Sequence, residues 1–164
     1  GDRKIVELLR RFGAKIEVQE DTVTAYPSGP SLRGIIIDAS QIPDMVPALA
    51  LVAAVANGTT EIRHAERLRL KESDRLMSVT EVLNALGGRV EERPDGLVIT
   101  GRDVLSGGSF DGYGDHRIVM MAAIASLITT DKVILTGGAA VNKSYPTFFT
   151  VLEENRMGKN LERR

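Results

Sequence analysis

The chain has 164 residues, of which 43% are hydrophobic and 26% are charged, and its formal net charge is -1 at pH 7. A chain of this length can bury the core of one ordinary domain. The balanced charge and the 4% aromatic content argue against a general nucleic-acid binder. The absence of cysteine excludes a disulfide framework, a thiolate nucleophile and a thiolate zinc site, and two histidines argue against a histidine-rich metal site.

The first residue is Gly1 rather than methionine, and no signal-peptide or transit pattern follows it. The longest apolar run, Met45–Ala56, has twelve residues and contains Pro47. That run fits a buried core helix and is too short to span a bilayer. We therefore expect a piece of a longer cytoplasmic protein that has no membrane contact.

Apolar residues at helical spacing predict a helix over Lys4–Phe12 that ends at Gly13. Two short segments, Lys15–Val18 and Thr22–Tyr26, predict a hairpin, and Pro27–Pro30 predicts a loop. The remaining predicted elements are, in chain order, a strand at Ile35–Asp38, a buried helix at Asp44–Ala56, a strand at Thr59–Arg63, an amphipathic helix at Ser73–Leu86, a hairpin of Arg89–Glu92 and Leu97–Thr100, a buried helix at Ile118–Ile128, a strand at Lys132–Leu135 and an amphipathic helix at Pro146–Asn155 that ends near Met157-Gly158.

The order of these elements repeats with a period of about 70 residues, which predicts an α/β fold of repeated βαβαββ units. Three segment pairs share nearly one shift: Gly13–Thr24 with Gly87–Val98 at 74 residues, Asp44–Lys71 with His116–Lys143 at 72, and Leu86-Gly87 with Met157-Gly158 at 71.

The period divides the chain into three predicted units. The first, residues 1–30, is incomplete because it begins at its second helix. The second covers about residues 31–102, and the third about residues 103–158. We expect them to form one globular domain over residues 1–158, followed by a tail at 159–164.

The repeat places polar residues at equivalent helix starts, with Asp44 and His116 leading the buried helices and Lys71 and Lys143 leading the amphipathic ones. Free backbone N–H groups and the positive end of the helix dipole favour a bound anion at such places. If Lys71 opens its helix, Arg75 lies one turn later on the same face. We expect positive charge to gather on one face of the molecule.

Each of these polar groups also has an ordinary structural interpretation. The charged turn around Lys71 can be solvated, with Ser73 or Asp74 as a helix cap. Asp115 can likewise cap the helix that follows it, and Asp44 either caps its helix or acts as a general base. Arg117 can instead form a bidentate clamp on a carboxylate or phosphate, while Lys143 is either a surface lysine or a ligand contact after a small-residue loop.

Several motifs together resemble the 5-enolpyruvylshikimate-3-phosphate (EPSP) synthase family. The matching residues are Lys71-Glu72-Ser73-Asp74-Arg75-Leu76, Leu86-Gly87, Asp115-His116-Arg117, Lys143 with Tyr145-Pro146, Ile42-Pro43-Asp44 and Gly1-Asp2. The resemblance runs from Gly1 to about Gly158 and covers the C-terminal part of the enzyme.

The resemblance implies two domains, each an inverted α/β barrel of three βαβαββ units, with the ligands between them. It implies transfer of the carboxyvinyl group of phosphoenolpyruvate to the 5-hydroxyl of shikimate 3-phosphate, by addition and elimination, in aromatic amino-acid biosynthesis. No metal or organic cofactor is implied, and glyphosate competes at the phosphoenolpyruvate site. The missing N-terminal domain is then a partner of this chain, and we expect the chain alone to be inactive.

The resemblance also implies roles for single residues. Asp44 is implied as the base at the 5-hydroxyl, and Glu72 as the acid that exchanges a proton with the methylene carbon. Lys71 is implied to bind shikimate 3-phosphate, as is Arg67, although many members have an asparagine at the position of Arg67. The residues implied to hold phosphoenolpyruvate are Arg75, His116, Arg117 and Lys143.

Two other interpretations are open. A related carboxyvinyltransferase that acts on UDP-N-acetylglucosamine shares the fold, but it lacks the motif at residues 71–76. A free-standing βαβαββ module that binds RNA or a protein partner would need a basic face, which the balanced charge argues against.

Overall fold

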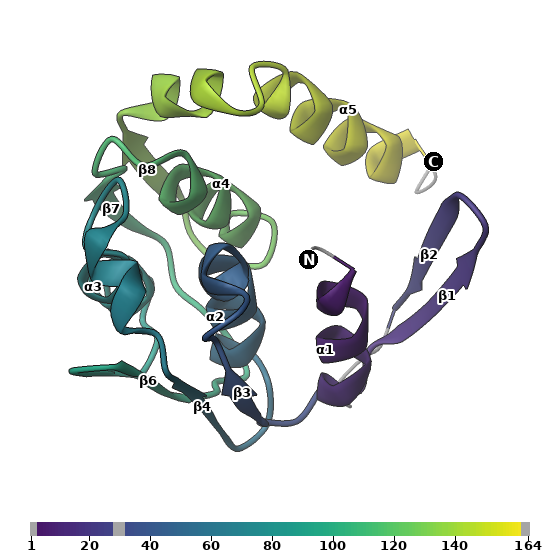
Figure 1. Ribbon diagram of the computed structural model, residues 1–164. Coiled ribbons are helices and arrows are strands. Elements are labelled where there is room, and N and C mark those ends of the chain that lie inside the picture. Colours follow the sequence, from purple (N-terminus) through teal and green to yellow (C-terminus); the bar gives the residue numbers. More distant parts are fainter. Residues whose placement is uncertain (1–2, 28–31, 162–164) are drawn as a thin grey trace.

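The computed structural model describes residues 3–27 and 32–161, and for residues 156–161 it describes the backbone alone (Figure 1). Three predictions lie wholly or partly outside this part of the chain. They concern the Gly1-Asp2 match, residues 28–30 of the loop predicted at Pro27–Pro30, and residues 162–164 of the tail predicted at 159–164.

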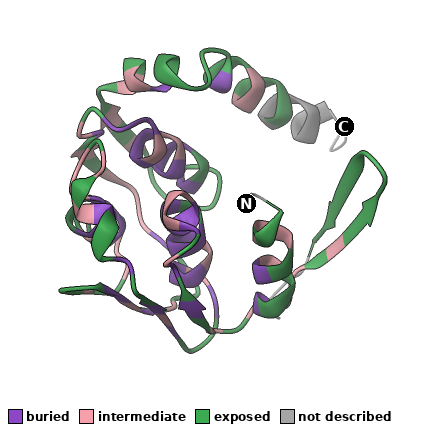
Figure 2. Cartoon of the chain, in the orientation of Figure 1, coloured by how far each residue is buried: buried purple, intermediate pink, exposed green. Residues whose placement is uncertain are grey.

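The N-terminal elements are the helix α1 (Lys4–Phe12) and the antiparallel hairpin of β1 (Lys15–Gln19) and β2 (Thr22–Tyr26). All three were predicted and are confirmed. Gly13 ends α1 because its φ of 104° is open to glycine at little cost, and its N–H donates to the Arg10 carbonyl. Every residue of β2 is exposed, as the green hairpin in Figure 2 shows.

The next segment begins with the strand β3 (Ile36–Asp38), the 3₁₀ helix η2 (Pro43–Met45), the helix α2 (Val46–Ala54) and the strand β4 (Thr59–Arg63). The strand β4 pairs in parallel with β3, so the intervening helix is a crossover connection. The predicted helix at Asp44–Ala56 is thus confirmed in its core, but its first turn is 3₁₀ rather than α. Proline has no backbone N–H, and in the first turn of α2 this removes no helical hydrogen bond, because the N–H groups of a first turn have no acceptor within the helix.

The chain continues through the 3₁₀ helix η3 (Glu66–Leu70), the helix α3 (Arg75–Ala85), and the hairpin of β5 (Val90–Arg93) and β6 (Gly96–Thr100). The hairpin joins β3 and β4 in one four-stranded sheet of order β3-β4-β6-β5.

The prediction that Lys71 opens the helix α3 is wrong. Lys71 instead follows the last residue of η3 in an extended conformation. The helix begins at Arg75 because the Asp74 side chain accepts hydrogen bonds from the N–H groups of Leu76 and Met77, which fixes the N-cap there. The predicted capping role of Asp74 is therefore confirmed.

The last segment contains the strand β7 (Gly108–Asp111), the helix α4 (His116–Ala125), the strand β8 (Val133–Thr136), the 3₁₀ helix η4 (Gly138–Lys143) and the helix α5 (Phe148–Leu161). The strands β7 and β8 pair in parallel. The sequence had not predicted β7. It also placed the start of α4 two residues too late, because Asp115 is the N-cap.

The predicted end of α5 near residue 158 is wrong, because the helix runs to Leu161. A glycine in a helix costs about 1 kcal/mol relative to alanine, so a single glycine there is not a stop in itself. Lys143 likewise does not open α5, since it is the last residue of η4.

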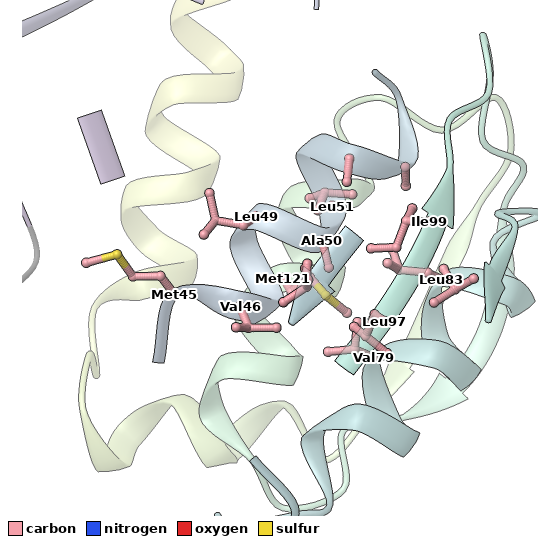
Figure 3. Packing of buried hydrophobic residues seen from close by; sticks show 14 of the residues in the cluster. Met45, Val46, Leu49, Ala50, Leu51, Val79, Leu83, Leu97, Ile99 and Met121 are labelled. Atoms are coloured by element: carbon pink, nitrogen blue, oxygen red, sulfur yellow. The ribbon is translucent and has the colours of Figure 1, made fainter. Parts of the chain in front are cut away.

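The helices α2, α3 and α4 pack on one another, and α2 and α3 also contact the four-stranded sheet through β6 (Figure 1). Figure 3 shows part of the resulting core, a single cluster that includes Val46 and Leu49 of α2, Leu83 of α3, Ile99 of β6 and Met121 of α4. All five side chains are buried, and each contributes about 1.5–3 kcal/mol of hydrophobic stabilisation. This packing fixes the starts of three helices next to each other.

Candidate anion-binding site

Charged side chains from four parts of the chain meet where α2, α3 and α4 begin. We call this set the polar cluster, and its members are Asp44, Lys71, Glu72, Arg75, Asp115, Arg117 and Lys143. It joins four cations to three carboxylates, so the positive charges that the sequence placed on one face are largely paired with acids.

Arg75 lies at the centre of the polar cluster and is 1% exposed. Its Nη1 donates to Oδ1 of Asp44 and its Nη2 to Oε2 of Glu72, each over 2.7 Å. Its Nε donates to Oδ2 of Asp115 over 2.7 Å, and Nη2 also reaches Oδ1 of that residue at 3.2 Å. Burial alone would lower the pKa of Arg75, but the three carboxylates outweigh burial and raise it. Arg75 is therefore a charged residue held by protein groups.

Asp44 lies in η2 and is 44% exposed, so its carboxylate is open to a ligand. Besides Arg75, it is approached by Lys71 Nζ at 3.2 Å from Oδ1 and by Arg117 Nη2 at 3.6 Å from Oδ2. Arg117 also donates from Nη1 to the Asp44 backbone carbonyl at 2.9 Å, which fixes its guanidinium beside the acid. Burial alone would raise the pKa of Asp44, but the hydrogen bond from Arg75 and the nearby positive charges outweigh it and lower the pKa.

Glu72 is bound by a cation at each of its oxygens. Lys143 Nζ donates to Oε1 over 2.7 Å, and Arg75 occupies Oε2. The hydrogen bond from Lys143 is the main cause that lowers the pKa of Glu72 to about 2. Because the Lys143 side chain is 59% exposed, this pair is at the surface, where an incoming anion can compete for the ammonium group.

Asp115 is fully buried at the N-cap of α4 and is the buried carboxylate of the polar cluster. It accepts hydrogen bonds from Arg75, from the Arg117 N–H at 2.9 Å and from Ser73 Oγ at 3.1 Å. Burial alone would raise its pKa, but these donors lower it. The cap predicted at Asp115 is confirmed, and the same carboxylate holds Arg75 in place.

His116 is buried beside the acids of the cluster. Its Nδ1 lies 3.9 Å from Oε1 of Glu72 and 4.0 Å from Oδ1 of Asp115. Those separations are too long for hydrogen bonds, and this nitrogen finds no partner among the described residues. This buried nitrogen therefore has a hydrogen-bonding capacity that the described protein groups leave unused.

Arg67 lies on η3 and is exposed, and its side chain makes no hydrogen bond or ion pair with the described part of the chain. Every other predicted site residue is in the polar cluster or beside it, and the roles of all of them stay predictions. The sequence reasoning missed the contact between Asp115 and Arg75. The sequence did contain a signal for this contact, because an acid, Asp115, leads the Asp115-His116-Arg117 triplet. That acid had been interpreted only as a helix cap.

Residues 3–27 and 32–161 contain no group of three or more His, Cys, Asp or Glu side chains arranged to hold a metal ion. Over that part of the chain no helix is both long and apolar enough to cross a membrane.

The fold and the polar cluster define a mixed α/β protein with a candidate anion-binding site at adjacent helix starts. Sequence comparison then gives the family. The chain belongs to the EPSP synthase family, whose profile, described as EPSP synthase (3-phosphoshikimate 1-carboxyvinyltransferase), matches residues 1–152.

Individual relatives agree with the profile. A protein of Clostridium novyi (strain NT) named 3-phosphoshikimate 1-carboxyvinyltransferase is 44% identical over 97% of this chain and 38% of its own length. A protein of Methanococcus maripaludis (strain C5) with the same name is 40% identical over 99% of this chain and 37% of its own length. The chain thus spans a little over a third of the length of these curated relatives.

Solved structures show the same fold. An EPSP synthase from Acinetobacter baumannii superposes with a TM-score of 0.83 and 30% identity, over 92% of this chain and 38% of that one. The enolpyruvyl transferase NikO from Streptomyces tendae gives a TM-score of 0.78 and 26% identity, over 93% of this chain and 34% of that one.

Proposed function

We propose that this chain is the part of a 3-phosphoshikimate 1-carboxyvinyltransferase that carries half of its active site. The whole enzyme transfers the carboxyvinyl group of phosphoenolpyruvate to the 5-hydroxyl of shikimate 3-phosphate and releases phosphate. The remaining domain of the same enzyme is the partner of this chain, and the enzyme works in the cytoplasm. The observation that carries the proposal is the polar cluster, in which two partly exposed carboxylates lie among four cations.

The substrates explain why the site needs so many cations. Phosphoenolpyruvate carries a carboxylate and a phosphate, and shikimate 3-phosphate carries the same two groups. In this proposal Arg117 and Lys143, whose side chains are 36% and 59% exposed, bind phosphoenolpyruvate, and His116 lies beside them. In this proposal Lys71, which pairs with Asp44, binds shikimate 3-phosphate, and Arg67 on the neighbouring η3 binds the same substrate.

In the first half of the reaction, the 5-hydroxyl oxygen forms a bond to C2 of phosphoenolpyruvate. Asp44 accepts the hydroxyl proton, for which its carboxylate is ionised at neutral pH because its pKa is lowered. When phosphoenolpyruvate draws Lys143 away from Glu72, the main cause of the low pKa of Glu72 is removed, and the carboxylate takes up a proton from solvent. Glu72 then gives this proton to the methylene carbon C3, so the double bond becomes single and a tetrahedral intermediate forms. In the second half, the bond from C2 to the phosphate oxygen breaks, and a proton from C3 returns to Glu72. The proton held by Asp44 leaves with the phosphate or with solvent.

Arg75 serves this chemistry by holding both carboxylates. Its two terminal nitrogens each bond one of them, so Asp44 and Glu72 are fixed at neighbouring points of one planar group. Base and acid therefore face a common space, as an addition across one double bond requires. The predicted direct contact of Arg75 with phosphoenolpyruvate is part of this proposal, and it uses the donor capacity that the three carboxylates leave.

Ligand titration followed by NMR tests the proposal on the 164-residue chain. Phosphoenolpyruvate and shikimate 3-phosphate should shift the amides of residues 71–75 and 115–117 and of Lys143, whereas UDP-N-acetylglucosamine should shift none. Arg117→Met should abolish the response to phosphoenolpyruvate, and Arg102→Met, an exposed arginine elsewhere, should leave it unchanged. Absence of shifts with both substrates, or a response to UDP-N-acetylglucosamine in place of shikimate 3-phosphate, overturns the proposal.

Turnover is tested in a chimera in which residues 1–152 replace the matching segment of the Clostridium novyi relative. The chimera should release phosphate only when both substrates are present. The 164-residue chain alone should release none, because it spans little more than a third of its relatives. Phosphate release by the chain alone would contradict the assignment of half an active site to it.

A further inference from the structure

The linker Lys71–Asp74, between η3 and α3, carries two residues of the polar cluster but has little backbone bonding of its own. The Lys71 amide donates to the Leu68 carbonyl over a long 3.4 Å. Within the described chain, the amides of residues 72–74 make no backbone hydrogen bond outside helices and strands. Inside the linker, Ser73 is held through its side chain, whose Oγ donates to Oδ2 of Asp115 over 3.1 Å. Apart from this contact and their own ion pairs, the positions of Lys71 and Glu72 depend on what holds the two ends of the linker.

Arg69 connects the two ends of this linker. It is a residue of η3, just before the linker, and its Nη1 donates to Oδ2 of Asp74 over 2.8 Å at the far end. Oδ1 of Asp74 is left to cap α3 through the amides of Leu76 and Met77. The contact thus closes residues 69–74 into a ring through a side chain, and it does so without using the oxygen that caps the helix.

The β5–β6 hairpin anchors the guanidinium of Arg69. Nη2 donates to the Arg93 carbonyl over 2.9 Å, and Nε donates to the Pro94 carbonyl over 3.0 Å. Nη1 also lies 2.8 Å from Oε1 of Glu92. All three nitrogens are therefore bonded, and a lysine, with one nitrogen, could not span these acceptors.

We propose that Arg69 is a positioning residue, which holds the linker against the hairpin so that Lys71 faces Asp44 and Glu72 faces Lys143. It touches none of these four side chains, so it acts through Asp74. Its effect on turnover rests on the proposed function, whereas its effect on the ion pairs of the linker does not. The alternative is that Arg69 only ties the hairpin to η3.

The titration of Glu72, followed by carboxyl ¹³C NMR in the 164-residue chain, separates these two roles. With Arg69→Gln, we expect Lys143 and Glu72 to pair for less of the time, so that the pKa of Glu72 rises by about 1 unit from its value of about 2. Arg63→Gln is the matched control, because Arg63 is an exposed arginine that pairs with Glu61 on its own strand. A purely structural tie to the hairpin would leave the titration of Glu72 unchanged in both variants.

Asp74→Ser gives a second approach that does not depend on how Arg69→Gln folds. Serine retains the capping role at the start of α3 but cannot pair with Arg69. Asp74→Ser should raise the pKa of Glu72 as Arg69→Gln does, and the double variant should show no further rise. An unchanged pKa of Glu72 in Asp74→Ser, with α3 intact by circular dichroism, would overturn the proposal even if the ligand titrations fail.

In the Clostridium novyi chimera, Arg69→Gln should lower kcat about tenfold, change KM less, and be only partly rescued by Arg69→Lys. Turnover within twofold of the parent chimera would overturn the positioning role in catalysis.

Discussion

Arg75 and Asp115 form a buried ion pair between the first residue of α3 and the N-cap of α4. Their closest atoms, Nε and Oδ2, lie 2.7 Å apart, and the side chains are 1% and 0% exposed. The two residues are 40 positions apart in the chain, so the pair ties two helix starts that the sequence does not connect. Because the same guanidinium holds Asp44 and Glu72, the geometry of the polar cluster depends on this contact.

Asp115→Asn should strongly destabilise the chain. Removing one member of a buried pair leaves the other charge uncompensated, which costs about 3–5 kcal/mol of unfolding free energy. We expect the lower end, about 3 kcal/mol, because Arg75 keeps two other carboxylates. Urea unfolding followed by circular dichroism measures the loss.

Asp103→Asn is the matched control, since Asp103 is exposed and makes no contact of this kind within the described residues. It should change the unfolding free energy by no more than about 0.5 kcal/mol. If Asp115→Asn cost no more than this control, the central role of the buried pair would be wrong.

Lys143→Met should change both the acid of the site and its affinity for ligand. Without the ammonium group at Oε1, the pKa of Glu72 should rise above its value of about 2. Affinity for phosphoenolpyruvate should fall about tenfold, the loss expected for one charge-assisted contact at the surface. Carboxyl NMR and ligand titration of the same sample measure the two effects.

The control for this variant is Lys132→Met, because Lys132 is an exposed lysine outside the polar cluster. Binding of phosphoenolpyruvate to the parent chain should itself raise the pKa of Glu72, since the ligand then competes for Lys143. A pKa of Glu72 that stays the same with ligand and in Lys143→Met would mean that Lys143 does not control this acid.

Most helices and strands could be predicted from the sequence, because their apolar spacing and glycine stops are local signals. The strand β7 was missed because it follows Gly107 and contains Gly108, which usually mark a loop. In the structure, a Cβ on Gly107 would lie 2.3 Å from the Lys132 carbonyl, and one on Gly108 would lie 2.7 Å from the Ala85 carbonyl. The glycines therefore permit close packing of backbones, which only the fold reveals.

The residue types of the site could also be predicted, but their pairing could not. The spacing predicted only that Arg75 is a cation one turn after Lys71. In the structure, Asp115 and the two other carboxylates bind Arg75 and hold it in the core. Such contacts join segments 31 and 40 residues apart, and no local pattern specifies them. The boundary of α3 was misplaced for a local reason, because two candidate caps, Ser73 and Asp74, stand side by side in the sequence.

The acid stability of the chain should depend on Glu72. Its pKa is about 2 in the folded chain and 4.5 without the fold, so the unfolded state binds the proton first as the pH falls. The stabilisation from this group is present above pH 4.5 and is lost between 4.5 and about 2. The lowered pKa values of Asp44 and Asp115 act in the same direction.

Glu72→Gln should therefore give a shallower fall of the unfolding free energy between pH 4.5 and 2 than the parent chain shows. Urea unfolding at several pH values measures the slope. Glu91→Gln, an exposed glutamate that pairs with Arg93, should leave the slope unchanged. Equal slopes for Glu72→Gln and the parent would show that Glu72 is not held as an ion in the fold.

Gly112→Ala should displace the Asp115 cap of the polar cluster by a steric clash, without changing any charge. Gly112 is buried between the end of β7 and the cap of α4, and its carbonyl accepts a hydrogen bond from the Asp115 amide at 2.9 Å. A Cβ there would lie 2.5 Å from Val119 Cγ2 and 2.9 Å from the Thr136 carbonyl, so the backbone must move. We expect a loss of about 1–3 kcal/mol and displaced Asp115 and Arg117 amides by NMR. Gly138→Ala is the control, because its Cβ would meet only the Phe149 ring, at 3.6 Å. It should lower the unfolding free energy by less than about 0.5 kcal/mol. Equal effects of the two variants would show that the close approach at Gly112 does not position the cap.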